Sequence, residues 1–302
     1  MCESHPHGPP HDHGVRHLDL RVGPDHSREF RVVLTGKGGV GKTSLTALLA
    51  RLLAREHHAV LAIDADPQMN LPYALGLERE AARDLVPLGR NDDYVEEKIG
   101  VRPGSGYGLF LKLNPDVSDV VDRFGVRGPD GVNLLVMGTT VQPAAGCLCP
   151  ENTLLAAVAD LVALRPGEAI LLDTQAGVEH FGRALAKGFR HCVVLTDPTF
   201  NGVQVGLYSA RLADQLGIPF VHLVINRVRS QADLDRALGY LQEDGDFPFS
   251  TRHVLPFDAA MLETEPAVDA LLDQPDSPLL QSVLGLRDAL TAGEEAWVRC
   301  VS

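Results

Sequence analysis

The sequence lacks any apolar run that is long enough to cross a membrane. No uninterrupted apolar stretch approaches the roughly 18 residues of a membrane-spanning helix, and the histidine-rich start has no apolar core of a secretory signal. The five cysteines are an odd number without the spacing of a disulfide framework. Such thiols are typical of a reducing compartment, so we expect a cytoplasmic protein.

Positive charge is also scarce. The 27 lysines and arginines are outnumbered by 40 aspartates and glutamates, so the 302 residues carry a formal net charge of −13. Nucleic acid and anionic membranes repel an acidic chain, and we expect neither as a partner. Hydrophobic residues make up 45% of the chain, which is enough for a substantial core.

Residues 1–28 offer little to such a core. This segment is rich in histidine, proline and glycine, and its composition predicts a disordered tail. Its imidazoles are suited to Ni²⁺, Zn²⁺ or Cu²⁺, and the candidate ligands are His5, His7, His11 and His13. The alternative is an expression tag or an inert polar tail, although the irregular spacing is unlike that of a tag.

Residues 29–302 alternate short apolar strands with helical stretches. This alternation predicts an α/β fold, with a predominantly parallel β-sheet and helices on both faces. The expected strands are 30–35, 59–63, 132–137, 169–172, 193–195 and 220–225. Residues 78–131 are more polar, and we expect helices and loops there; a helix that opens at Pro278 closes the chain. Because no repeat or serine-rich linker interrupts this segment, we expect one domain.

A glycine-rich turn joins the first expected strand to a helix. Gly36, Gly41, Lys42 and Thr43 match the phosphate-binding pattern G-x-x-x-x-G-K-[ST] in the strand–turn–helix context that it requires. Glycines let backbone N–H groups converge on phosphate oxygens, and the positive end of the helix faces the same anion. Lys42 would reach the β- and γ-phosphates of ATP, and the Thr43 hydroxyl would bind Mg²⁺. The other expected nucleotide-binding residues of the loop are Gly38, Gly39, Val40 and Ser44.

Three carboxylates follow expected strands. Asp173 comes directly after one strand, while Asp64 and Asp66 follow another. Ligands of parallel sheets collect at the carboxyl ends of the strands, beside such a loop. Asp173 is therefore the expected Mg²⁺ ligand, in the position of a Walker B aspartate. Any one of the three could instead cap a helix or a turn.

Lys37 is a second lysine in the loop, and on its own it could be a solvated charge. With Lys37, the loop resembles the deviant Walker A motif of the ATPase family that includes MinD, ParA, arsenite-pump and nitrogenase iron proteins. The resemblance implies a nucleotide-dependent homodimer in which Lys37 reaches the partner's nucleotide and stabilises transition-state charge. It also implies that Asp66 orients the attacking water and that Asn226 binds adenine, although Asn226 could equally be a turn residue.

Cys147 and Cys149 lie between an expected strand and a helix. Two thiols cannot complete a tetrahedral metal site within one chain. A two-fold dimer would place four thiolates on its axis, and such a set suits Zn²⁺ or Ni²⁺. Alternatively, the two thiols are half-buried side chains without a metal. Cys192 lies beside an apolar strand and is expected in the core.

At these cysteines a narrower resemblance appears. Four segments, in this order, resemble those of CooC-type nickel-insertion ATPases of carbon monoxide dehydrogenase: 36–43, 64–67, 146–152 and 176–183. The resemblance covers most of residues 30–260. It implies an ATP-hydrolysing homodimer that binds Ni²⁺ or Zn²⁺ at the paired cysteines and serves the catalytic subunit of carbon monoxide dehydrogenase. The histidine-rich tail departs from this pattern, as does Gln175, where the family is expected to have an acidic residue.

Two other functions stay open. A positioning or partition switch of the MinD/ParA kind would use the same nucleotide site. Such proteins often need a basic amphipathic helix or a DNA-binding patch, whereas residues 289–299 are neither basic nor strongly amphipathic. An iron–sulfur carrier or reductase would use the same cysteines.

Overall fold

A computed structural model describes residues 30–103, 112, 115–138, 153–155, 157–158, 168–175, 189–243, 245 and 247–301. The histidines of the tail and both Cys147 and Cys149 lie outside the described residues.

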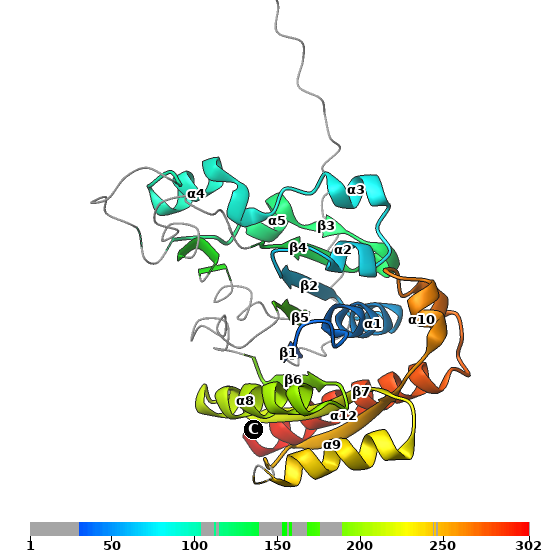
Figure 1. Cartoon of the computed structure of the whole chain (residues 1–302). Helices are drawn as coiled ribbons and strands as arrows, with labels where there is room; N and C mark the ends of the chain where they lie inside the picture. Colours follow the sequence, from blue (N-terminus) through cyan, green and yellow to red (C-terminus); the bar gives the residue numbers. More distant parts are fainter. Residues whose placement is uncertain are drawn as a thin grey trace, which may run out of the picture.

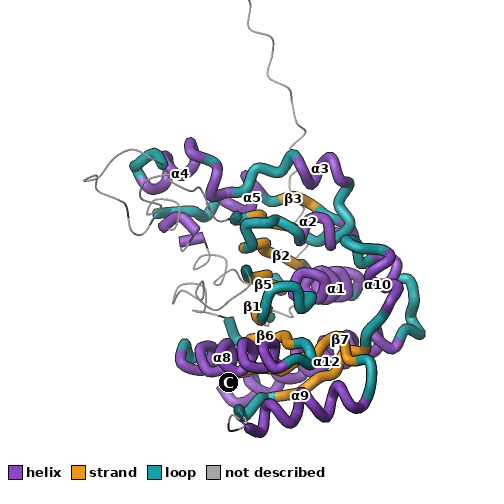
Figure 2. Tube along the Cα trace, in the orientation of Figure 1, coloured by secondary structure: helices purple, strands orange, loops and turns teal. Residues whose placement is uncertain are grey.

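A β-sheet forms the centre of the described structure, with the strand order β3-β4-β2-β5-β1-β6-β7-β8. The strands are β1 (Arg31–Gly36), β2 (Val60–Ala65), β3 (Val126–Arg127), β4 (Asn133–Val136), β5 (Ala169–Thr174), β6 (His191–Thr196), β7 (Phe220–Val228) and β8 (Thr251–Pro256). All neighbouring strands are parallel except β3 and β4. Figure 2 shows this sheet as a central layer between helices.

The central strands are apolar because both of their faces are covered. All six residues of β1 are buried, as are all six of β5 and of β6. Val32 and Leu34 pack in one apolar cluster, while Val33 between them packs in a second cluster on the opposite face. This alternation follows from the two-residue period of a strand. The predicted parallel α/β fold is therefore confirmed.

Helices cover both faces of the sheet (Figure 1). One apolar cluster joins the sheet to α1 (Lys42–Arg55), α2 (Leu71–Ala74), α11 (Asp269–Leu272) and α12 (Pro278–Val301). The clusters on the other face include residues of α4 (Asp92–Ile99), α5 (Val120–Phe124), α8 (Phe200–Gln215) and α9 (Gln231–Glu243). The remaining short helices are α3 (Arg79–Arg83), α10 (Ala259–Glu263), η1 (Leu88–Arg90) and η2 (Pro129–Gly131). No helix among the described residues is both long and apolar enough to span a bilayer.

The structure differs from the sequence-based prediction at the edges of the sheet. Strands β3 and β8 were not predicted. Strand β3 has only two residues, and β8 alternates exposed and half-buried side chains, with only Leu255 buried. Strand β7 continues beyond its predicted end to Val228, through an irregularity after Ile225. Cys192 is fully buried in β6, as expected.

A chain of hydrogen bonds crosses the amino ends of β6, β7 and β8. His191 Nδ1 lies 2.9 Å from His222 Nε2, and His222 Nδ1 lies 2.7 Å from Thr251 Oγ1. The same hydroxyl oxygen lies 2.9 Å from His253 Nε2. Burial lowers the pKa of His222 to about 3, and the neighbouring His191 and His253 act in the same direction. Burial thus favours the neutral form of His222, and burial also lowers the pKa of His253.

Candidate functional site

The strand order assembles the candidate site at the carboxyl ends of the strands. Strand β1 leads into the glycine-rich loop, and β5 lies between β1 and β2. In the registers of these pairs, Asp173 lies opposite Leu34 on one side and opposite Asp64 on the other. Two carboxylates from separate parts of the chain thus meet beside the loop, as ligand-binding groups do in parallel sheets.

Two glycines of the loop stand where a side chain would collide. Gly36 has φ of 140°, and a Cβ atom there would lie 2.1 Å from the Leu195 carbonyl oxygen of β6. Gly41 has φ of 98°, and its Cβ atom would lie 2.7 Å from Asn226 Nδ2. The glycine pattern is therefore required by the close approach of the loop to β6 and β7.

The first turn of α1 presents unpaired backbone donors to the loop. Gly41 precedes the helix without a side-chain cap, and no acidic residue lies in the first turn. The first N–H groups of a helix have no partner within the helix, and the helix dipole adds positive potential there. This arrangement suits a phosphate group, as the sequence pattern predicted.

Lys42 is buried within the loop, with 6% of its surface exposed. Its Nζ atom donates to the carbonyl oxygens of Gly36 and Lys37, each at 3.2 Å. Burial lowers the pKa of Lys42, and the negative charges of Asp173 and Asp66 oppose that shift. The ammonium group is thus held at the loop by weak carbonyl contacts, which a phosphate oxygen could replace with stronger charge-assisted ones.

Thr43 and Asp173 form a direct contact. Thr43 Oγ1 donates to Asp173 Oδ2 at 2.7 Å, and Thr46 Oγ1 donates to the other carboxylate oxygen at 3.4 Å. Burial raises the pKa of Asp173 to about 7; Thr43 and Lys42 oppose this rise, whereas Asp66 adds to it. Asp173 is therefore a buried carboxylate with incomplete compensation of its charge.

Asp64 is completely buried and fixes the turn that follows β2. Its Oδ1 atom accepts from the Asp66 N–H, and its Oδ2 atom accepts from the Leu71 N–H, both at 2.9 Å. Burial raises the pKa of Asp64 to about 8, and the charge of Asp173 adds to this rise. Asp66 itself is only partly buried, and its carboxylate accepts from the Gln68 N–H at 2.9 Å. The role of Asp64 is thus to position the turn that carries Asp66.

The oxygen groups at this edge fit Mg²⁺. The Thr43 hydroxyl and the Asp173 carboxylate are hard donors in contact with each other, and the buried carboxylates Asp64 and Asp173 exceed the single buried ammonium of Lys42. Within the described residues, no group of three or more histidine, cysteine or acidic side chains could hold a metal. Mg²⁺ does not need such a group, since it usually keeps waters and binds through one or two protein ligands plus phosphates.

Lys37 lies at the surface of the loop, with 38% of its side chain exposed. Its Nζ atom is 3.9 Å from Asp197 Oδ2, and Asp197 comes directly after β6. Asp197 was not predicted as a site residue from the sequence. Its signal was the same as that of Asp173, an acidic residue directly after an apolar strand.

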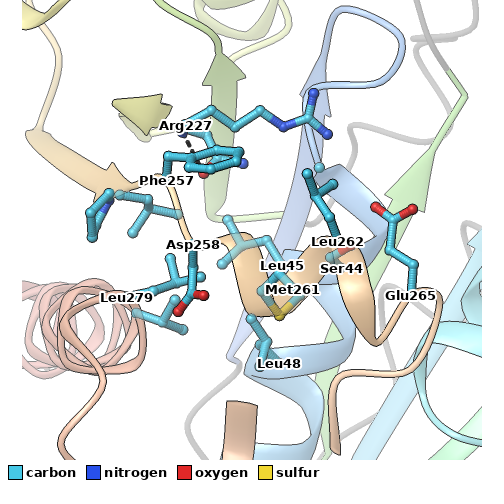
Figure 3. Close-up of a pocket in the computed structure, with 15 residues that line it drawn as sticks. Ser44, Leu45, Leu48, Arg227, Phe257, Asp258, Met261, Leu262, Glu265 and Leu279 are labelled. Carbon is cyan, nitrogen blue, oxygen red and sulfur yellow. Dashed lines mark hydrogen bonds between the residues drawn. The ribbon is translucent and has the colours of Figure 1, made fainter. Parts of the chain in front are cut away.

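Asn226, the expected adenine ligand, makes two hydrogen bonds within the chain. Its Nδ2 atom donates to the Val40 carbonyl oxygen at 2.7 Å, and its Oδ1 atom accepts from the Arg227 N–H at 2.8 Å. Beside it, a pocket is lined by apolar side chains of α1, β8 and α10, including Leu45 and Met261 (Figure 3). An apolar pocket next to a phosphate-binding loop could hold a flat base.

Gln175 follows β5, where the resemblance led us to expect an acidic residue. Its buried Oε1 atom has no hydrogen-bond partner among the described residues. A second acidic group two positions after the buried Asp173 would add another negative charge to this edge. A neutral amide avoids that cost.

Comparisons with known proteins agree with this geometry. The model of the CobQ/CobB/MinD/ParA nucleotide binding domain matches residues 32–265. The carbon monoxide dehydrogenase accessory protein CooC of Rhodospirillum rubrum is 33% identical over 238 residues, which cover 79% of this chain and 88% of that protein. An uncharacterised ATP-binding protein of Methanocaldococcus jannaschii is also 33% identical, over 236 residues that cover 78% and 88% of the two chains.

Solved structures show the same fold. The cell division ATPase MinD of Pyrococcus furiosus matches with a TM-score of 0.58 and 20% identity, covering 87% of this chain and 99% of that one. The MinC:MinD complex of Aquifex aeolicus matches with a TM-score of 0.56 and 19% identity, covering 86% and 93%. From its sequence, its fold and its nucleotide loop, the chain belongs to the CobQ/CobB/MinD/ParA nucleotide-binding family, as a CooC-type ATPase.

Proposed function

We propose that this ATPase is a homodimeric metallochaperone that supports nickel insertion into carbon monoxide dehydrogenase. The observation that carries the proposal is the 33% identity, over 79% of the chain, with the carbon monoxide dehydrogenase accessory protein CooC of Rhodospirillum rubrum. The sequence around Cys147 and Cys149 supports it, because thiolates are suitable ligands for Ni²⁺.

The nucleotide end of the sheet performs hydrolysis in this proposal. Backbone N–H groups of the loop and Lys42 bind the phosphates, and Thr43 with Asp173 holds Mg²⁺. When bound there, Mg²⁺ would supply positive charge that neutralises the phosphates. Asp66, on the turn fixed by Asp64, orients the attacking water. Lys37 reaches the nucleotide of the partner, so that hydrolysis depends on assembly of two chains.

Nickel is the cargo. Cys147 and Cys149 of two chains supply four thiolates at the dimer axis, and one Ni²⁺ or Zn²⁺ binds between them. ATP favours one arrangement of the two chains, and hydrolysis returns them to the other, which changes the geometry of the shared thiolates. The imidazoles of His5, His7, His11 and His13 bind further ions more weakly.

Maturation of the target enzyme tests this function. Carbon monoxide dehydrogenase is produced with the wild-type chain, without it, and with a variant that carries both Cys147→Ser and Cys149→Ser. At limiting nickel, we expect high nickel content and activity only with the wild-type chain. The matched control is Cys192→Ser, a fully buried thiol outside the proposed metal site. Full maturation by the Cys147/Cys149 double variant would refute nickel delivery through these thiols.

A second candidate is a positioning or partition switch, and membership of a family that includes MinD and ParA favours it. Such a switch would work through nucleotide-dependent partners and would leave the nickel content of carbon monoxide dehydrogenase unchanged. The maturation experiment separates the two functions. A colourless protein after anaerobic purification, silent in electron paramagnetic resonance, would exclude the third candidate, an iron–sulfur carrier.

A further inference from the structure

The ion pair between Lys37 and Asp197 carries an inference beyond the function proposed above. The two residues lie in separate segments, one in the loop after β1 and the other directly after the neighbouring strand β6. Lys37 Nζ is 3.9 Å from Asp197 Oδ2, and both side chains are partly exposed, by 38% and 20%. The lysine that is expected to reach another chain is thus bound to an acid of its own chain.

The carboxylate of Asp197 is held in place by the start of α8. Thr199 Oγ1 donates to Asp197 Oδ1 at 2.5 Å, and the same threonine caps α8 by accepting from the Gly202 N–H at 3.1 Å. A Cβ atom on Gly202 would lie 2.0 Å from Asp197 Oδ1. The carboxylate therefore lies directly against a glycine in the first turn of a helix, where the helix dipole favours negative charge.

We propose that Asp197 is a latch that holds Lys37 on its own chain and opposes its use by a partner. This inference rests on the proposed function, in which Lys37 acts across a dimer. A lysine paired with Asp197 must leave that carboxylate before its ammonium group can reach a second nucleotide. Asp197 is thus a positioning residue, and it sets the threshold at which ATP drives assembly.

The size of the effect follows from the geometry. A partly exposed ion pair changes an equilibrium by up to about five-fold. A symmetric dimer must release two latches, so the two contributions multiply to a change of up to about 25-fold in the dimer dissociation constant. The effect decreases at high ionic strength, because salt screens exposed pairs.

Two variants break the latch by different means. Asp197→Asn removes the charge, and Gly202→Ala retains the charge but displaces the carboxylate. The added Cβ atom would also lie 2.9 Å from Thr196 Oγ1 and 3.0 Å from the Asp197 carbonyl oxygen, so the melting temperature of this variant is measured beside its assembly. The matched control is Asp93→Asn in α4, which removes an equal charge from an exposed ion pair with Arg102.

Sedimentation with a non-hydrolysable ATP analogue measures the dimer dissociation constant of each full-length variant. We expect both latch variants to assemble more tightly than wild type, by about 2-fold to 25-fold, and Asp93→Asn to match wild type. Unchanged or weaker assembly of both latch variants would overturn the proposal.

A second measurement separates this inference from the proposed function. The rate at which an amine-reactive reagent labels Lys37 in the nucleotide-free monomer is followed by peptide mass spectrometry. Asp197→Asn should raise that rate by up to about five-fold, and an unchanged rate would show that no latch exists. If instead Lys37→Ala alone retains nucleotide-dependent assembly, the role of Lys37 across the dimer is wrong, whatever the labelling rate.

Discussion

The two ends of the parallel sheet bury polar groups in opposite ways. At the carboxyl ends, burial raises the pKa values of Asp64 and Asp173 to about 8 and about 7, and only Lys42 is buried there as a countercharge. At the amino ends, His191, His222 and Thr251 are linked in a chain of hydrogen bonds. The imidazoles at the amino end are thus hydrogen-bonded to one another and to a hydroxyl, whereas the carboxyl end buries two carboxylates against one ammonium group. The buried carboxylates lower the stability of the protein when no ligand is bound. We therefore expect the ligand to bind at the carboxyl end of the sheet.

The largest expected effect is on ATP hydrolysis, and it follows from the loss of Lys42 at the carboxyl end of the sheet. Lys42→Ala removes the buried ammonium, and we expect ATP hydrolysis to fall at least about 100-fold, as for the loss of one preorganised catalytic charge. Phosphate release at saturating ATP measures this effect. The control is Arg79→Ala, an exposed cation of α3, which should hydrolyse ATP as wild type does. If Lys42→Ala hydrolyses ATP at the wild-type rate, the loop does not have the phosphate-binding role assigned to it.

Asp173→Asn should separate activity from stability. Removing this carboxylate takes away the Mg²⁺ ligand, so hydrolysis should fall at least about 100-fold. It also removes a buried charge beside Asp64, so the nucleotide-free protein should become more stable by about 1–2 kcal/mol. The melting temperature should then rise by about 2–4 °C for each kcal/mol, while the exposed control Asp122→Asn should not raise it. A lower melting temperature would show that Asp173 stabilises the fold.

The amino end should respond to acid instead. The pKa of His222 is lowered from 6.5 to about 3 by burial, so the unfolded chain binds this proton more readily than the folded one. The contribution of His222 to stability is therefore present above pH 6.5 and declines as the pH falls towards 3. Between pH 7.5 and pH 5, we expect a loss of about 2 kcal/mol.

Urea unfolding at the two pH values tests this sign. His222→Gln should reduce the acid-dependent loss, whereas His58→Gln, at an exposed position, should leave it unchanged. The rate of ATP hydrolysis by the wild-type protein at pH 7.5 is the activity with which both variants are compared. If His222→Gln loses as much stability on acidification as wild type does, the histidine chain is not the acid-sensitive element.

The smallest effect on either end is expected from deleting residues 1–28. The tail should bind several Ni²⁺ ions weakly at pH 7.5 and release them near pH 5, as its imidazoles become protonated. Its removal should lower the nickel stoichiometry but leave ATP hydrolysis and urea stability unchanged. Calorimetric titration with Ni²⁺ gives the stoichiometry, and an unchanged value after deletion would mean that the tail is inert.

The sequence predicted the interior of the sheet better than its edges. Central strands such as β1 are apolar on both faces, so they stand out as continuous runs. Edge strand β8 begins with three polar residues, Thr251, Arg252 and His253, and only Leu255 in it is buried, so it gave no such signal. A two-residue strand such as β3 has no periodicity from which it could be predicted.

The candidate site also has parts that the sequence predicts and parts that it does not. Gly36 to Thr43 form a local motif, and Asp173 follows a clear strand, so both were found from sequence. The contact of Lys37 with Asp197 depends on β6 lying next to β1, and this neighbour relation is a property of strand order. The hydrogen bond from Asn226 to Val40 joins β7 to the loop for the same reason. Contacts between distant segments required the three-dimensional structure.

The central claim is a metal site that two chains share, and its most direct test is the nickel content of the dimer. Protein without residues 1–28 is equilibrated with Ni²⁺ and a non-hydrolysable ATP analogue, and its mass and metal content are measured in sedimentation fractions. The account predicts about one Ni²⁺ per dimer, from the four-thiolate count. It also predicts that changing both Cys147 and Cys149 to Ser removes this ion but not nucleotide binding. A double variant that keeps its full nickel complement would contradict the proposed metallochaperone.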